Sequence, residues 1–151
     1  MTEDNSTYFE ISEGGNLIKI EVFGLQYPNT DDDWDKNWLN CMIPVKAGVF
    51  SGKFRANLMT TDFGTFKNGI INLYNKLDGV SAFYTLESQA DIKIIGDGIG
   101  HLEAQCEVMD NVGFGNKLNF KINFDQTQIQ GIINQLEKIT NEFPITGELK
   151  I

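Results

Sequence analysis

Short segments in which apolar and polar residues alternate strictly are the feature that most constrains the fold of this chain. In residues 101–108, Leu102, Ala104, Cys106 and Val108 fall on one side and polar residues on the other. Because successive strand residues point to opposite faces, this pattern predicts strands with one buried and one solvated face, as is typical of antiparallel sheets. The same alternation recurs at residues 8–11, 18–22, 39–45, 50–58, 80–86, 92–94 and 118–124.

Apolar residues spaced three or four apart predict two amphipathic helices, near residues 62–77 and 126–142. Strands and helices together predict an α+β fold: an antiparallel sheet of about seven or eight strands with both helices packed against it. A chain of 151 residues is the size of one domain. We therefore expect a single domain over residues 1–151, with residues 1–6 frayed.

Local signals refine where the helices begin and end. Asp62 and Asp125 are expected N-caps, and Gly79 is expected to take the left-handed position after the first helix. The tetrapeptide at residues 69–72, Gly-Ile-Ile-Asn, recurs at residues 131–134. This weak repeat suggests two similar strand-to-helix units.

The apolar faces of neighbouring strands must meet, which predicts hairpin register. Placing Ile94 opposite Leu102 centres one hairpin on Gly98. A two-residue turn would misalign the faces, so we expect a three-residue turn with a bulge, using Gly98 or Gly100 at positive φ.

The same reasoning for the following hairpin predicts two exposed cross-strand ion pairs. Glu107 is expected opposite Lys117, and Glu103 opposite Lys121. Such pairs stabilise a sheet by only about 0.2–1 kcal/mol each.

The formal net charge of −9 limits the classes of partner that this protein can bind. It argues against direct binding of nucleic acid, which requires a basic surface, and suits a basic protein partner. No apolar run approaches the ~20 residues of a membrane span, and the polar N-terminus lacks a secretory signal, so we expect no membrane contact and a cytoplasmic location. Cys41 and Cys106 are expected to be buried free thiols.

Candidate catalytic and metal sites are weak. Residues 31–42 imitate the start of a calcium loop, but Lys36 and Met42 stand where such a loop needs Gly and Glu. His101 is the only histidine, and strand parity places Cys106 on the opposite face, which excludes a local Cys–His pair. Residues 96–100 are rich in glycine but lack the Lys-Ser/Thr of a phosphate loop. We therefore expect no enzyme activity, no cofactor and no metal.

The most biased stretch is Tyr27 to Asn40. It contains both tryptophans, Trp34 and Trp38, and four aspartates within five positions: Asp31, Asp32, Asp33 and Asp35. One interpretation is a solvated loop anchored to the core by its tryptophans. The other is a negative, aromatic recognition surface.

Part of this stretch carries a family resemblance. Tyr27-Pro28, followed by Asp33 to Asn40, resembles the D-x-W-D-x-N-W-L region of WapI-like immunity proteins. The resemblance continues through residues 96–101, Gly-Asp-Gly-Ile-Gly-His, and from residue 115 to the Asp-Gln-Thr at 125–127. It implies a small cytoplasmic protein that binds and neutralises a cognate toxin domain, often a nuclease, and it implies no catalytic residues.

Charge and resemblance together predict an immunity protein that acts by forming a stoichiometric complex with a basic toxin. The predicted partner-binding residues are Asp31, Asp32, Asp33, Trp34 and Asp35. Two other classes stay open: a small-molecule-binding β-rich module with an apolar pocket between sheet and helices, and an adaptor subunit. The sequence does not indicate the oligomeric state.

Overall fold

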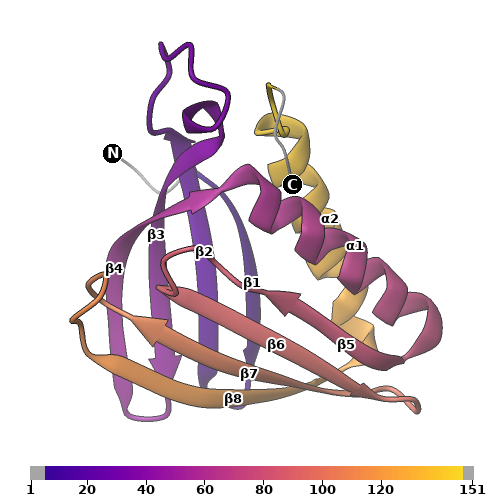
Figure 1. The fold of residues 1–151 in the computed structure, drawn as a ribbon. Helices are drawn as coiled ribbons and strands as arrows, with labels where there is room; N and C mark the ends of the chain where they lie inside the picture. Colours follow the sequence, from indigo (N-terminus) through magenta and orange to yellow (C-terminus); the bar gives the residue numbers. More distant parts are fainter. Residues whose placement is uncertain (1–5, 148–151) are drawn as a thin grey trace.

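Eight strands and two α-helices make up residues 6–147, the part of the chain that the computed structural model describes (Figure 1). Of the segment expected to fray, residues 1–6, only Ser6 lies within the described residues. The strands are β1 (Thr7–Glu13), β2 (Asn16–Leu25), β3 (Trp38–Ala47), β4 (Phe50–Met59), β5 (Asp78–Phe83), β6 (Ala90–Asp97), β7 (His101–Met109) and β8 (Lys117–Asp125). The helices are α1 (Thr60–Lys76) and α2 (Ile129–Glu142).

The strands form two antiparallel sheets, each of four strands in chain order: β1-β2-β3-β4 and β5-β6-β7-β8. The predicted α+β class, with antiparallel strands and two helices, is confirmed. The strands divide between two sheets because α1 separates β4 from β5. The strands of the two sheets cross steeply, as Figure 1 shows.

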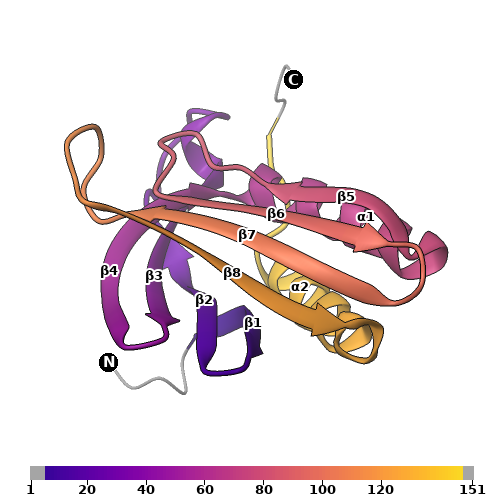
Figure 2. The ribbon, with the colours of Figure 1, turned by 90° about the horizontal axis from the view of Figure 1, so that it is seen from below.

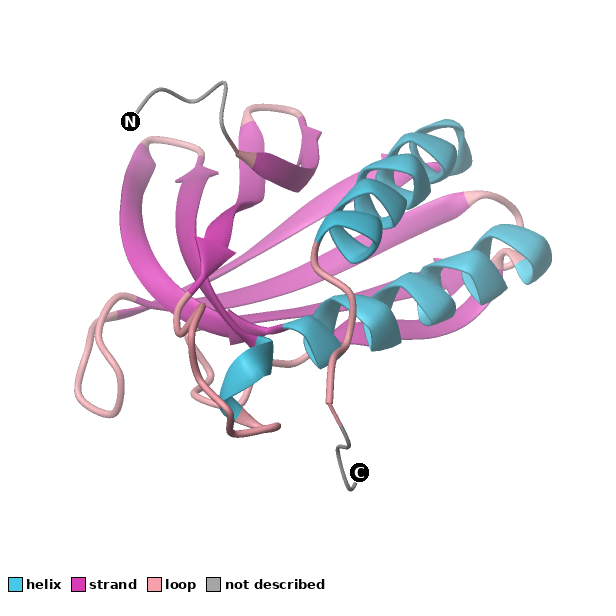
Figure 3. Ribbon diagram, turned by 90° about the horizontal axis from the view of Figure 1, so that it is seen from above, coloured by secondary structure: helices cyan, strands magenta, loops and turns pink. Residues whose placement is uncertain are grey.

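Each sheet is followed by one helix, so the unit suggested by the weak repeat is four strands and a helix, present twice. Each helix packs against an edge strand of the other sheet: α1 lies along β5 and α2 along β1, and the two helices touch each other (Figure 3). The Ser81 hydroxyl donates to the Phe66 carbonyl at 3.4 Å, and the Glu10 N–H donates to Gln135 Oε1 at 3.0 Å. These contacts cover two of the four sheet edges.

Four phenylalanines fill the space between the sheets and α1. Phe9, Phe63, Phe66 and Phe83 are almost fully buried, and their ring centroids lie 5.2–6.1 Å apart, mostly edge to face. Such pairs add about 0.5–1.5 kcal/mol each beyond the area they bury. Packed rings thus occupy a region where a ligand-binding module would need a cavity.

The ends of α1 differ from the sequence prediction. The helix begins after Met59, and Asp62 is its third residue, whose Oδ2 accepts the Met59 N–H at 3.0 Å. Asp62 was therefore wrongly predicted as the N-cap. Gly79 was also wrongly predicted as the left-handed terminus: Leu77 takes that conformation, with φ 60°, because β5 starts at the next residue.

Asp125 is confirmed as a cap. Its carboxylate accepts the Thr127 N–H at 2.9 Å and the Thr127 hydroxyl. This arrangement starts a 3-10 turn, Gln126–Gln128, which leads directly into α2.

The β6–β7 hairpin has the predicted faces but another register. Ile94 lies opposite Ala104, two residues from the prediction, so the parity of each strand is unchanged. Three residues separate the strands, and both Gly98 and Gly100 have positive φ, 87° and 107°.

The two ion pairs predicted between β7 and β8 are present, as diagonal rather than direct neighbours. Lys117 lies 3.6 Å from Glu107, and Lys121 lies 3.4 Å from Glu103. The residue directly opposite each glutamate is an asparagine. The residues of both pairs alternate with the buried residues of β7 and β8, so the pairs lie on the outer face of the second sheet. This face is turned to the viewer in Figure 2, with both helices on the far side.

Candidate functional site

A loop of residues 26–37 joins β2 to β3 and projects beyond the end of the first sheet, at the top of Figure 1. We call it the acidic loop. It is closed at its base by a hydrogen bond from the Gln26 N–H to the Trp38 carbonyl, 2.9 Å long. Its last three residues, Asp35–Asn37, form a 3-10 turn that leads into β3. All five predicted partner-binding residues lie on this loop.

The five side chains differ in what they can offer a partner. Asp31 and Asp32 are exposed, and Trp34 is 45% exposed. Asp33 and Asp35 are partly buried, and the Asp33 carboxylate lies 3.3 Å from the Lys36 ammonium. The structure therefore presents two carboxylates and one indole most openly.

Local hydrogen bonds give the acidic loop its shape. The Asp32 N–H donates to the Thr30 hydroxyl at 3.1 Å, and Asp32 Oδ1 accepts the Asp35 N–H at 2.9 Å. Short polar side chains that bond backbone two or three residues away favour turns over regular structure. The dense run of aspartates thus has a structural role as well as a charge.

A buried asparagine fixes the loop to the rest of the molecule. The Asn37 side chain is fully buried, and its amide donates to the carbonyls of Asp33 and Thr146, both at 2.8 Å. Its oxygen accepts the Thr146 N–H at 3.0 Å and the Thr60 hydroxyl. Both donors and both acceptor positions of the amide are used. One side chain therefore joins the loop, the start of α1 and the segment after α2.

Two exposed apolar side chains precede the aspartates in the sequence. Leu25, the last residue of β2, and Tyr27, the second residue of the loop, are 40% and 44% exposed, close to the value for Trp34. The sequence prediction did not include Leu25 or Tyr27. Their signal was proximity in sequence to the aspartates.

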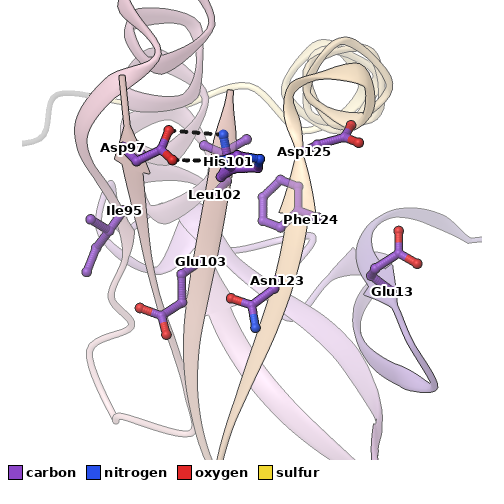
Figure 4. A pocket seen from close by; sticks show the side chains of 10 residues that line it. Glu13, Ile95, Asp97, His101, Leu102, Glu103, Asn123, Phe124 and Asp125 are labelled. Carbon is purple, nitrogen blue, oxygen red and sulfur yellow. Dashed lines mark hydrogen bonds and ion pairs between the residues drawn. The ribbon is translucent and has the colours of Figure 1, made fainter. Parts of the chain in front are cut away.

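A second group of polar residues lies at the β6–β7 turn, on the other sheet (Figure 4). His101 Nδ1 is 2.8 Å from Asp97 Oδ2, and Asp97 Oδ1 accepts the backbone N–H groups of Ile99 and His101. The hydrogen bond from Ile99, followed by those from His101, lowers the pKa of Asp97. His101 is 75% exposed in its side chain, and the pair closes the turn.

The thiols lie away from this histidine. Cys41 and Cys106 are free and buried, as predicted, and face the core from β3 and β7. Burial raises the pKa of Cys106 to about 12 and that of Cys41 still further above the ordinary range. Both are therefore protonated at neutral pH and are poor nucleophiles.

Across residues 6–147, no group of three or more His, Cys, Asp or Glu side chains is placed to hold a metal ion. The helices in this part of the chain are also too short or too polar to cross a membrane.

Other residues of the family-like motifs hold turns and caps, as Asp97 and Asp125 do. Gly100 packs against Gln126: a Cβ at Gly100 would lie 2.6 Å from Gln126 Oε1, and the Gln126 N–H donates to the Gly100 carbonyl at 2.9 Å. Asn116 donates its backbone N–H to Asp110 Oδ1 at 2.7 Å at the base of the β7–β8 turn. These residues hold turns and caps, although Asn116 and Gln126 are themselves exposed.

Comparison with curated proteins gave no match. Comparison with family models matches residues 9–144 to the "Immunity protein WapI-like family". The match extends from β1 to the end of α2, and it includes the acidic loop, the buried Asn37 and the β6–β7 turn. The chain therefore belongs to the WapI-like immunity protein family.

Proposed function

We propose that this protein neutralises a cognate toxin domain by forming a stoichiometric complex with it, and that the acidic loop is part of the contact surface. Membership of an immunity protein family carries the proposal, since an immunity protein acts on a toxin partner. The exposed acidic and aromatic side chains of the loop supply a surface of the kind that binds proteins.

Electrostatics supports a basic partner. The protein has a net charge of −9, and Asp31 and Asp32 add two exposed carboxylates at a projecting loop. A toxin that cuts nucleic acid needs positive charge to bind phosphates, and an acidic surface accelerates association with such a domain. Trp34 adds a large, half-exposed aromatic surface that can be desolvated on contact.

We expect a neighbouring open reading frame to encode a large secreted protein with a toxic C-terminal domain, and that domain is the partner used to test the proposal. Co-expression should rescue cells from that domain. In vitro, titrating the toxin with this protein should abolish toxin activity with a sharp break at one equivalent. Inactivation by far less than one equivalent would indicate catalysis, and absence of binding or rescue would refute the proposal.

The contribution of the loop is tested by Asp31→Asn/Asp32→Asn. Association should slow, and its dependence on salt should become weaker, while the dissociation rate changes little. Glu137→Gln/Glu142→Gln, on exposed positions of α2, is the matched control because it changes the net charge equally. Equal association kinetics for the two variants would remove the acidic loop from the contact surface.

A further inference from the structure

A groove of about 910 Å³ runs over the outer face of the first sheet, on the side away from the core. Its lining comes from three adjacent strands and includes Phe23, Leu25, Met42, Pro44, Lys53 and Arg55. We call it the sheet groove. In β2 the pairing register shifts between Val22 and Gly24, so Phe23 is the bulged residue. A bulge bends and twists its strand, which accounts for a hollow at this place.

The sheet groove is continuous with the acidic loop. Leu25 and Asn40, which line one end of the groove, lie at the two stems of the loop. They flank the Gln26–Trp38 hydrogen bond that closes it. A partner that contacts the loop and extends along the sheet would therefore enter the groove.

The unpaired charge of the groove is positive. Glu21 also lines it, but this glutamate is only 6% exposed and its carboxylate lies 3.6 Å from the Lys19 ammonium. Lys53 and Arg55 are exposed, and no ion pair formed within residues 6–147 includes either of them. Two adjacent, unpaired cations in a protein of net charge −9 are a local reversal of sign.

We propose that the sheet groove binds a segment of the toxin domain that carries an aspartate or glutamate between apolar residues. The carboxylate would pair with Arg55 and Lys53, and the apolar side chains would lie on Phe23 and Met42. Arginine binds a carboxylate with two parallel hydrogen bonds, which fixes orientation as well as strength. The inference rests on the proposed function and deepens it.

The opposite charges of the acidic loop and the sheet groove favour one orientation of the toxin domain in the complex. The acidic loop attracts basic residues, whereas the neighbouring groove repels them and requires an acid. A partner with uniform positive charge would bind the loop but be repelled at the groove, so the groove discriminates among basic domains. The overall negative charge disfavours a nucleic-acid phosphate as the occupant.

The test is the affinity of Lys53→Glu/Arg55→Glu for the toxin domain, measured by surface plasmon resonance. Lys76→Glu/Lys138→Glu, at exposed helix positions, is the control with the same change in net charge. The groove variant should bind at least about 10-fold more weakly, mainly through faster dissociation, and the control within about 2-fold of wild type. The milder Lys53→Gln/Arg55→Gln should show a smaller loss in the same direction, and melting temperatures verify that each variant folds.

Carbodiimide cross-linking gives an independent readout, because it joins an amine to a carboxylate that it contacts. In the wild-type complex, mass spectrometry should find Lys53 joined to an aspartate or glutamate of the toxin. Equal affinity of the groove and control variants, with no cross-link at Lys53, would overturn the inference and leave the proposed function intact. Failure of the wild-type protein to bind the toxin would overturn both.

Discussion

Asn37→Ala tests whether one buried side chain holds the acidic loop in place. The substitution removes all four hydrogen bonds of the amide. One is made with Asp33, one with Thr60 and two with Thr146. A hydrogen bond contributes about 0.5–1.5 kcal/mol net. Thr60 is buried, whereas Thr146 is exposed and can form hydrogen bonds with water in the variant. The cost of losing the four bonds therefore lies toward the lower end of the sum of their contributions. We expect a loss of about 2–3 kcal/mol in the free energy of unfolding.

The assay is urea denaturation followed by tryptophan fluorescence, which reports on the loop because Trp34 and Trp38 flank the asparagine. Asn57→Ala is the matched control: its amide donates to Leu39 and Asn40 on the face of the first sheet. Since that site is partly open to water, the control should lose no more than about 1 kcal/mol. A loss below about 1 kcal/mol for Asn37→Ala, or equal losses for both variants, would refute the role assigned to Asn37.

For further substitutions, the surroundings of each residue predict whether the protein is stabilised or destabilised. A Cβ at Gly69 would lie 2.5 Å from the Ser81 hydroxyl of β5, whereas nothing lies within 4 Å of a Cβ at Gly131. In urea denaturation Gly69→Ala should therefore destabilise the protein by about 1–3 kcal/mol, and Gly131→Ala should stabilise it by about 0.5–1 kcal/mol. The reverse order would contradict the packing described for α1. Burial raises the pKa of Asp62 to about 6, so the folded state holds that proton more tightly than the unfolded chain, and this stabilisation is lost as the pH rises from about 4 through 6. Asp62→Asn should therefore be about as stable as wild type near pH 4 and more stable by about 1–3 kcal/mol above pH 7. A difference in unfolding free energy between variant and wild type that did not depend on pH would contradict the raised pKa of Asp62. Asp125→Ala should cost about 1 kcal/mol in thermal unfolding through loss of the cap, and Asp125→Asn much less.

The alternation of residues predicted the strands and the buried face of most of them, because that face depends only on parity. The face of β5 was predicted wrongly: Val80 is exposed, and Ser81 and Phe83 face the core. Register was not predicted correctly: Ile94 pairs with Ala104 rather than Leu102, and a slip of two residues leaves every side chain on the same face. The division into two sheets was also beyond the pattern, since alternation does not say which strands are neighbours.

The acidic loop was predictable as a composition but not as a structure. Its charge and its tryptophans are visible in the sequence, whereas the partners of Asn37 lie as far away as Thr60 and Thr146. A buried polar residue is identified by what it bonds, and no local pattern gives partners that distant. For the same reason the sheet groove, built from three strands, had no signature in any one of them.

The W-D-x-N-W-L motif begins at Trp34, directly after Asp31 to Asp33, and the side chains of the acidic loop have different tasks. Asn37 is buried and bonded, while Asp31 and Asp32 are exposed. A change at Asn37 should therefore weaken toxin binding only as far as it unfolds or loosens the loop. Asp31→Asn/Asp32→Asn should weaken binding with stability little changed, because an asparagine at position 32 keeps an oxygen that can accept the Asp35 N–H. Since Asn37 and the other hydrogen-bonded residues shape the loop whatever the partner, we infer that the choice of toxin depends on the exposed residues of the loop.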